Sequence, residues 1–248
     1  MRIQGRGQSI RRDKGIANKR PLIIGIGGAH SGAGKTTYAS LLLRNFKGWG
    51  AIKYTKTGLY SSIIDDREVL ETEDKDTKRF LDAGAEKVLW VQSPPADLAE
   101  VLPMAVERLS DLKGIIVEGN SAIEFLRPDI IIFILGSESS KIKETAKGLF
   151  KRADVIVAEE GVSLETKGEA GRFRRSPDDY DAFLGYIREM IDKKEKIKAS
   201  LKESAVDGKI SCPLARKIAK DLSVPFKEVG EAANELKIKI TDCELGCF

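Results

Sequence analysis

The segment from Pro21 to Thr37 constrains the fold of this chain more than any other stretch. It opens with Leu22–Ile26, an apolar run rich in β-branched residues that is typical of a strand buried on both faces. A glycine-rich stretch follows and ends in Gly-Lys-Thr, and the good helix formers of Tyr38–Leu43 come next. A strand, a glycine-rich loop, a Lys-Thr pair and a helix in this order predict a Walker A phosphate loop.

Each part of this predicted loop has a role in holding a polyphosphate. Glycines let consecutive backbone N–H groups turn toward the phosphates, and the new helix adds its positive end. Lys35 would reach the β- and γ-phosphates, and the Thr36 hydroxyl would bind Mg²⁺. The first glycine of the pattern is expected at residue 29, but the chain has alanine there and glycine one place earlier. The predicted nucleotide-binding residues of the loop are Gly28, Ala29, His30, Ser31, Gly32, Ala33, Gly34, Lys35, Thr36 and Thr37.

A second apolar stretch, Gly114–Glu118, predicts a strand that ends in an acidic residue. This is the form of a Walker B element, whose carboxylate holds or orients a magnesium-bound water. Any buried strand can end in an acidic residue, so this motif alone is weak evidence for a Walker B element. The phosphate loop earlier in the chain strengthens the interpretation. We therefore predict that Thr36 and Glu118 serve Mg²⁺ and that Lys35 and Glu118 are catalytic residues.

Two further residues are candidates beside the loop. Lys53 lies near the C-terminal end of a predicted strand, Gly50–Thr57, where open α/β sheets place their ligand crevice. It is a candidate for contact with phosphate or substrate, although a strand end that frays into a polar loop explains it equally well. Asp76 begins a predicted helix and suits an N-cap, which by itself needs no chemistry.

Predicted strands and helices alternate regularly along residues 21–176, the expected nucleotide-binding domain. This pattern predicts an α/β fold with a doubly wound, mostly parallel sheet and helices on both faces. The acidic segment 60–74 is expected to be irregular. The basic segment 163–176 is expected to be a loop that closes over a phosphate or is simply solvated.

Beyond the sheet domain, residues 177–205 are predicted to form a long connecting helix, and residues 206–248 a small helical domain. Two short helices joined by a tight turn and followed by a strand resemble a helix-turn-helix module. The second of these helices, 226–236, is net acidic, which disfavours DNA and favours a protein partner or a regulatory role.

The three cysteines are Cys212, Cys243 and Cys247. An odd number argues against a disulfide framework and for a reducing cytoplasm. Three thiolates could hold an iron–sulfur cluster or a zinc ion with a fourth ligand from elsewhere, but their spacing matches no strong metal signature. A metal site and three plain reduced thiols both stay open.

The overall composition excludes some classes of protein. No apolar run approaches the roughly 18 residues that span a bilayer, and no secretory hydrophobic segment opens the chain, so we expect a cytoplasmic protein without a membrane partner. Residues 1–20 carry seven Lys or Arg and one Asp, which predicts a basic flexible arm. The net charge of the whole chain is only +4, which gives no general nucleic-acid signature.

Four stretches carry a resemblance to a known family: Ser31–Thr37, Ile52–Thr55, Asp74–Ala85 and Ile116–Gly119. They resemble the molybdopterin-guanine dinucleotide biosynthesis protein B family, a GTP-binding family in the signal-recognition/MinD-like class of P-loop proteins. The resemblance covers roughly residues 21–135 and implies phosphate binding by the loop, magnesium near Thr36 and Glu118, and a nucleotide-dependent change around Asp76, which adds Asp76 to the predicted catalytic residues. Tyr54 stands where the family has histidine, and no guanine-reading Asn-Lys-x-Asp follows Ala158.

The sequence thus predicts a slow P-loop nucleoside triphosphatase that acts as an accessory factor in molybdenum-cofactor or related metal-cofactor biosynthesis, with GTP slightly favoured over ATP. One alternative is an ATP-dependent small-molecule kinase whose acceptor site contains Lys53, Asp76 and Arg172–Arg175. Another is a nucleotide-responsive regulator that binds DNA or protein through residues 206–248. Slow hydrolysis is expected because no residue stands out as a base or an arginine finger. Homodimer formation stays open.

Overall fold

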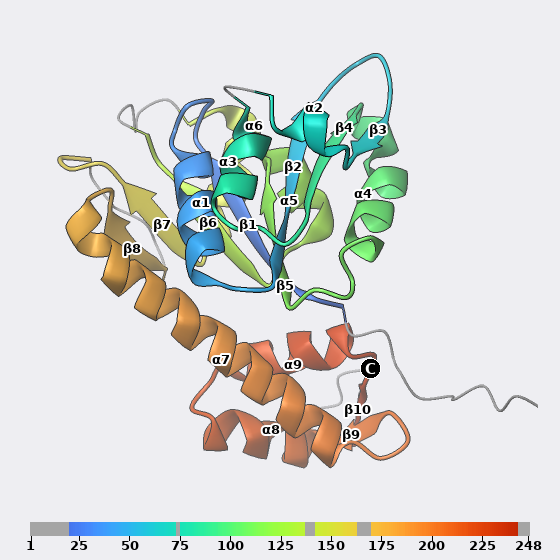
Figure 1. The fold of residues 1–248 in the computed structure, drawn as a ribbon. Coiled ribbons are helices and arrows are strands. Elements are labelled where there is room, and N and C mark those ends of the chain that lie inside the picture. Colours follow the sequence, from blue (N-terminus) through green and yellow to red (C-terminus); the bar gives the residue numbers. More distant parts are fainter. Residues whose placement is uncertain (1–19, 73–74, 137–141, 163–169, 243–248) are drawn as a thin grey trace, which may run out of the picture. The chain divides into compact units, whose positions relative to one another are not determined.

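The computed structural model describes residues 20–72, 75–136, 142–162 and 170–242. The chain divides into two compact units, Met1–Arg175 and Ser176–Phe248 (Figure 1). The expected basic arm, apart from Arg20, lies outside the described residues, as do the cysteines of the C-terminal tail.

The first unit is built on an eight-stranded sheet of order β3-β4-β2-β5-β1-β6-β7-β8. Every neighbouring pair is parallel except β3 and β4, which are antiparallel. This confirms the predicted mostly parallel α/β fold. The strands are β1 (Leu22–Gly28), β2 (Trp49–Lys56), β3 (Ser62–Ile64), β4 (Val88–Ser93), β5 (Gly114–Glu118), β6 (Ile130–Ile134), β7 (Val155–Ala158) and β8 (Gly171–Arg174).

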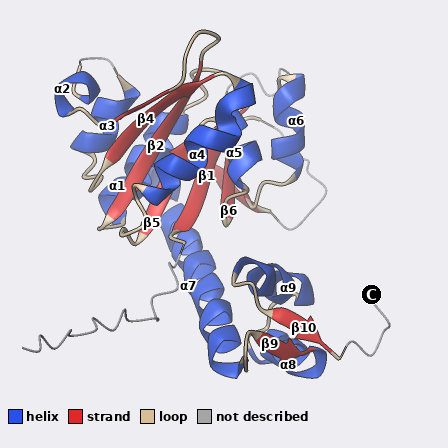
Figure 2. Cartoon of the chain, turned by 90° about the vertical axis from the view of Figure 1, so that its right-hand side faces the viewer, coloured by secondary structure: helices blue, strands red, loops and turns tan. Residues whose placement is uncertain are grey.

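Helices cover both faces of this sheet, as a doubly wound fold requires (Figure 2). One face shares a continuous apolar core with α4, α5 and α6, and α1 and α3 lie on the other face. Buried isoleucine, leucine and valine fill the central strands, so the sheet forms a rigid base for the residues at its C-terminal edge. The helices are α1 (Lys35–Asn45), α2 (Arg67–Leu70), α3 (Asp76–Asp82), α4 (Leu98–Glu107), α5 (Asn120–Leu126) and α6 (Glu144–Lys151).

The strand order brings the predicted functional residues together. Strand β5 lies between β1 and β2, so its last residue, Glu118, is in register with Ile26 on one side and with Lys53 on the other. Because Ile116 and Glu118 lie on the opposite face from the buried Val117, the Glu118 carboxylate is on the side of α1 and α3. Topology alone therefore places Lys53 beside the end of β5.

Two segments differ from their expected structure. The acidic segment 60–74, expected to be irregular, contains β3 and the short helix α2, whose N-cap Asp66 accepts a hydrogen bond from the Val69 backbone. The basic segment expected to be a loop contains β8, which pairs with β7 along its whole length. The strand forms because the free backbone N–H and C=O groups of β7 gain hydrogen bonds from it. This gain outweighs the low strand preference of a polar segment.

The second unit consists of a long helix followed by a compact β-α-α-β arrangement. Strands β9 and β10 pair in parallel, and α8 and α9 share an apolar core with the second half of α7. The long helix and the two short helices occur where the sequence predicts them, whereas β9 is not predicted. No helix among the described residues is long and apolar enough to cross a membrane. The elements are α7 (Tyr180–Ser204), β9 (Lys209–Ser211), α8 (Cys212–Asp221), α9 (Phe226–Glu235) and β10 (Lys239–Thr241).

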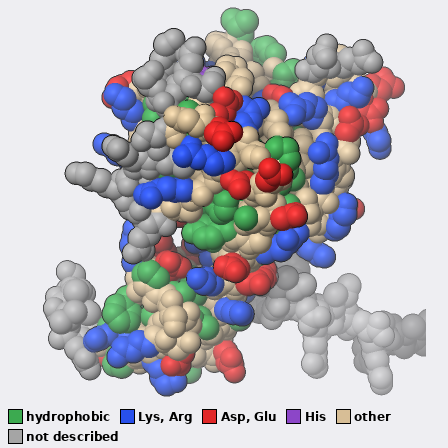
Figure 3. All heavy atoms as spheres, turned by 90° about the vertical axis from the view of Figure 1, so that its left-hand side faces the viewer, with side chains coloured by type: hydrophobic (Ala, Val, Ile, Leu, Met, Phe, Trp, Pro, Cys, Tyr) green, Lys and Arg blue, Asp and Glu red, His purple; other side chains and the backbone are tan. Residues whose placement is uncertain are grey.

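Charge is mixed on the face of the molecule that Figure 3 shows. Lys and Arg side chains are interspersed there with Asp and Glu. This agrees with the small net charge of the chain, +4. Among the described residues on this face there is no wide basic surface of the kind that nucleic-acid binding requires.

Candidate functional site

The phosphate loop connects β1 to α1 at the C-terminal edge of the sheet. Gly34 is the N-cap of α1 and has a φ of 100°, a left-handed conformation that glycine adopts without strain. No side chain caps this helix end, and its first turn carries no acidic residue. The positive end of α1 is therefore available to an anion held in the loop.

The structure explains why alanine replaces the expected glycine at residue 29. The Ala29 side chain is fully buried in the core, and the Ala29 backbone N–H donates to the Ile134 carbonyl at 3.0 Å. Residue 28 is more confined, because an added Cβ there would lie 3.1 Å from Cγ of Lys35 and 3.2 Å from the Ile134 carbonyl oxygen. The loop therefore accommodates a methyl group at residue 29, whereas one at residue 28 would crowd Lys35.

Asn120 holds the start of the loop. Its amide oxygen accepts from the Gly28 backbone N–H at 3.0 Å, and its amide nitrogen donates to the Gly28 carbonyl at 2.9 Å. Asn120 is the first residue of α5, directly after β5 and Gly119. Sequence analysis missed this residue; its only signal was a polar side chain soon after the strand that ends in Glu118.

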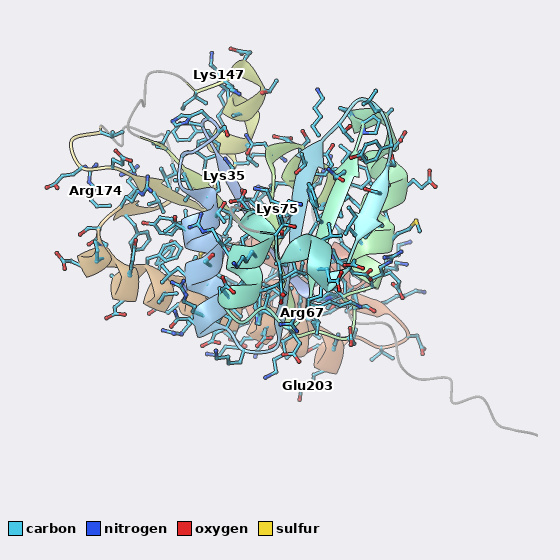
Figure 4. The ribbon with its side chains drawn as sticks, turned by 45° about the horizontal axis from the view of Figure 1, so that its top comes forward. Lys35, Arg67, Lys75, Lys147, Arg174 and Glu203 are labelled. Carbon is cyan, nitrogen blue, oxygen red and sulfur yellow. The ribbon has the colours of Figure 1, made fainter. Side chains whose placement is uncertain are left out.

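Lys35 lies across the loop that it terminates. Its ammonium donates to the His30 carbonyl at 2.9 Å. Burial lowers the pKa of Lys35 from its usual value, and the attraction of Glu118 offsets this only in part. Figure 4 looks onto this edge of the sheet and labels Lys35 at the start of α1.

Thr36, Glu118, Lys53 and Asp76 form one hydrogen-bonded cluster, which we call the carboxylate cluster. The Thr36 hydroxyl donates to Oε2 of Glu118 at 2.9 Å. The Lys53 ammonium donates to Oε1 of Glu118 at 2.6 Å and also to Oδ2 of Asp76. The structure thus brings together these four residues, which the sequence predicted from separate motifs.

The charges of this cluster support one another. Burial alone would lower the pKa of Lys53, but Glu118 and Asp76 outweigh it and raise the pKa above its usual value. Burial alone would raise the pKa of Asp76, but the hydrogen bond and charge of Lys53 hold it below the usual value. Glu118 is only 2% exposed, so its charge depends on Lys53 for compensation.

Helix α3 contacts the loop through a residue that sequence analysis did not single out. Nη2 of Arg79 donates to the Thr37 hydroxyl at 3.2 Å, and Nη1 of Arg79 lies 3.9 Å from Oδ1 of Asp76. Asp76 and Arg79 occupy successive turns of α3, so this helix touches both the phosphate loop and the carboxylate cluster. The signal in the sequence was an acid and a base three residues apart.

The oxygen ligands present suit Mg²⁺. Magnesium prefers hard oxygen donors and commonly takes only one or two protein ligands beside phosphate and water. The Thr36 hydroxyl and the Glu118 carboxylate, 2.9 Å apart, provide such a pair at the end of the phosphate loop. Among the described residues there is no group of three His, Cys, Asp or Glu that could hold a metal ion without such help.

The proposed cysteine metal site is only partly within the described chain. Cys212 is a free, half-buried thiol at the first position of α8. Cys243 and Cys247 lie outside the described residues. An iron–sulfur cluster or zinc ion on these three cysteines therefore stays a prediction from sequence.

The chain has distant similarity to proteins of known structure. No family model and no curated protein matches this chain. HypB from Helicobacter pylori in complex with nickel is 14% identical over 68% of this chain and 86% of its own, with a TM-score of 0.46. LpxK from Aquifex aeolicus in complex with ATP is 18% identical over 82% of this chain and 68% of its own, with a TM-score of 0.41.

Similarity at this level concerns the fold and carries no argument about ligands. The assignment rests on the chain itself. Its phosphate loop follows β1, and helix α1 begins at the lysine of the loop. The strand that ends in Glu118, β5, is a direct neighbour of β1 in the sheet. The chain has the fold of a P-loop nucleoside triphosphatase.

Proposed function

We propose that this chain binds a nucleoside triphosphate together with Mg²⁺ and hydrolyses it slowly. The observation that carries this proposal is the hydrogen bond between the Thr36 hydroxyl and the Glu118 carboxylate at the end of the phosphate loop. It joins a hydroxyl and an acid from motifs 82 residues apart, in the arrangement that a magnesium-bound triphosphate requires.

In the proposed complex each residue has a separate role. The backbone from Gly28 to Thr37 surrounds the phosphates, and Lys35 neutralises the β- and γ-phosphates. Thr36 and Glu118 would hold Mg²⁺, which when bound neutralises charge on the phosphate oxygens. Lys53 donates to the Glu118 oxygen that does not bond to Thr36, and it would add a second cation to the site.

Slow hydrolysis is part of the proposal because the acids of the site are already engaged. Glu118 accepts hydrogen bonds from both Thr36 and Lys53, and Asp76 accepts one from Lys53. Lys53 keeps the pKa of Asp76 below its usual value, which makes this carboxylate a weak general base, and both oxygens of Glu118 already accept hydrogen bonds.

Calorimetric titration of the purified chain with GTP and ATP in the presence of Mg²⁺ tests this proposal. Wild type should bind at least one of the two nucleotides, and Lys35→Ala should lose most of the affinity. Lys47→Ala is the matched control, because Lys47 is exposed near the opposite end of α1 and should leave the affinity unchanged. Absence of binding of both nucleotides to wild type would refute the proposal.

For the cellular role, we propose an accessory factor in molybdenum-cofactor or related metal-cofactor biosynthesis, with GTP favoured slightly over ATP. The support is the resemblance of the four sequence stretches, each of which contributes to the site described above: the loop, Lys53 on β2, Asp76 on α3 and Glu118 on β5. Fluorescence titration with molybdopterin, with and without Mg²⁺ and GTP, provides the test. Saturable binding supports the role, and absence of binding in both states contradicts it.

An ATP-dependent small-molecule kinase is a second candidate, favoured by one observation. Beyond Lys53, the same face of the sheet carries Thr55, whose hydroxyl accepts from the Trp90 indole N–H at 3.0 Å. The Lys75 ammonium lies 4.6 Å from the centre of the Trp90 ring. Such a polar and aromatic strip beside the terminal phosphate would suit an acceptor. Transfer of the γ-phosphoryl group of ATP to a component of a metabolite extract would support this candidate, and absence of transfer would remove it.

A further inference from the structure

Arg175 directly follows β8, the outermost strand on one side of the sheet, and its side chain lies against the phosphate loop. A Cβ placed on Gly34 would lie 2.9 Å from Cζ of Arg175 and 3.1 and 3.2 Å from its two terminal nitrogens. Because the central carbon is nearer than either nitrogen, the planar guanidinium faces the Gly34 backbone rather than directing one nitrogen at it. Its N–H edges therefore extend sideways along the entrance to α1.

Strands β7 and β8 hold Arg175 in this position. The Arg175 backbone N–H donates to the Ala158 carbonyl at 2.7 Å and so continues the pairing of the two strands. Nη1 of Arg174 donates to the carbonyls of Glu159 at 3.1 Å and Val162 at 2.7 Å, which fixes the turn after β7. Figure 4 labels Arg174 at the end of β8.

The turn after β7 supplies a partner for Arg175. Nη1 of Arg175 donates to Oε1 of Glu159 at 2.9 Å, and the two side chains are 30% and 35% exposed. This bond uses one of the five N–H donors of a guanidinium. The remaining edge of the fork suits a second anion, because a guanidinium binds carboxylate and phosphate oxygens in pairs.

The charge balance at Gly34 calls for such an anion. Arg175 and Lys35 are both adjacent to the positive end of α1, and the first turn of that helix carries no acidic residue. A cation beside a helix N-terminus is unfavourable. Glu159 pairs with Arg175, and Glu118 attracts Lys35, whereas a bound polyphosphate would place several negative charges beside both cations.

We propose that Arg175 is a further phosphate-binding residue of the nucleotide site, which contacts the polyphosphate at the Gly34 end of the loop. The inference rests on the proposed nucleotide binding and extends it, because it adds a cation from β8 to a site otherwise made by β1, α1, β2 and β5. The sequence allowed two roles for the basic segment 163–176, a phosphate contact or a solvated surface. The proposal assigns the first role to Arg175.

The test compares two arginines that make similar half-exposed ion pairs. Arg152 pairs with Glu124, and the two side chains are 43% and 40% exposed. Arg152 lies between the end of α6 and the start of β7, so it is at the N-terminal ends of the strands, whereas the phosphate loop is at their C-terminal ends. Dissociation constants of Mg²⁺-GTP, Mg²⁺-ATP and inorganic tripolyphosphate are measured for wild type, Arg175→Ala and Arg152→Ala. If Arg175→Ala does not fold, Arg175→Gln, which keeps the stem and removes the charge, replaces it.

Arg175→Ala should weaken every ligand that wild type binds by a similar factor of about ten, the expected effect of one charged hydrogen-bonding group. Arg152→Ala should change none of them. An unchanged affinity in Arg175→Ala would overturn the inference. So would a loss for the nucleotides alone, because Arg175 would then contact the base or ribose. Wild type that binds none of the three probes would instead refute the proposed function itself.

Discussion

Two ion-pair clusters flank the phosphate loop, and they differ chiefly in exposure. In the carboxylate cluster, Lys53 is 17% exposed and Glu118 2%. In the Arg175–Glu159 pair, the two side chains are 30% and 35% exposed. A buried ion pair cannot lose one partner without leaving an uncompensated charge, whereas an exposed pair exchanges partners with water and ions at little cost. We therefore interpret the Lys53–Glu118 pair as fixed framework and the Arg175–Glu159 pair as an exchangeable contact.

The largest expected effect comes from removing the cation of the buried cluster. Lys53→Met should lower the free energy of unfolding by about 3–5 kcal/mol, because it leaves Glu118 buried without its ammonium partner. Urea unfolding followed by circular dichroism measures this change. Lys53→Arg, which keeps the charge, should lose less. A loss below about 1 kcal/mol for Lys53→Met would break the distinction between the two clusters.

The next effect concerns the glycine against which Arg175 packs. Gly34→Ala should cost about 1–3 kcal/mol because of its φ of 100°, and the new Cβ should displace the Arg175 guanidinium, the flexible end of its side chain, at little further cost. Gly161→Ala is the matched control, since Gly161 has a φ of 82° and open space around it, and it should lose a similar amount. Unfolding midpoints that show a much larger loss in Gly34→Ala would mean that Arg175 is held rigidly and is not an exchangeable contact.

A smaller effect should appear in acid. The pKa of Asp76 is lowered in the folded chain, so its contribution to stability is present above the unfolded value of about 3.9 and disappears as the pH falls through the folded pKa. When the pH is lowered below about 4, the free energy of unfolding of Asp76→Asn should therefore decrease less than that of wild type. Asp82→Asn, an exposed position at the end of the same helix, is the control for urea midpoints measured across this range. Parallel acid profiles of wild type and Asp76→Asn would contradict this account.

The smallest effect on stability should come from the exposed pair. Arg175→Ala and Glu159→Gln should each change the free energy of unfolding by about 1 kcal/mol or less, as is usual for exposed ion pairs. Thermal melting of both variants beside wild type measures this. A large loss of stability in Arg175→Ala would make Arg175 a structural residue and remove the contrast with Lys53.

The sequence predicted most of the site because its signals are local. The order of strand, glycine-rich loop and Lys-Thr identified the phosphate loop, and a strand ending in an acid identified Glu118. Asn120 and Arg79 were missed, and Arg175 was named only within a basic segment of open role, because the residues that they contact at the loop are distant in the chain. Arg175, for example, lies 141 positions after Gly34, and only the order of β7 and β8 in the sheet brings the two together.

The prediction of the fold was limited in a similar way. The long apolar strands were evident from their composition, whereas β3, β8, α2 and α5 are short elements of three to seven residues. Strands β3 and β8 lie at the two edges of the sheet and form because a neighbouring strand offers backbone hydrogen bonds. No local pattern in their own residues announces such pairing.

The magnesium dependence of nucleotide binding is the strongest test of the proposed site. The dissociation constant of the preferred nucleotide would be measured with Mg²⁺ and with EDTA, for wild type and for Thr36→Val, which removes the hydroxyl that meets Glu118. Wild type should bind the nucleotide much more tightly with Mg²⁺, and Thr36→Val should lose most of this difference. Equal affinity of wild type with Mg²⁺ and with EDTA would contradict the assignment of Thr36 and Glu118 as the magnesium site.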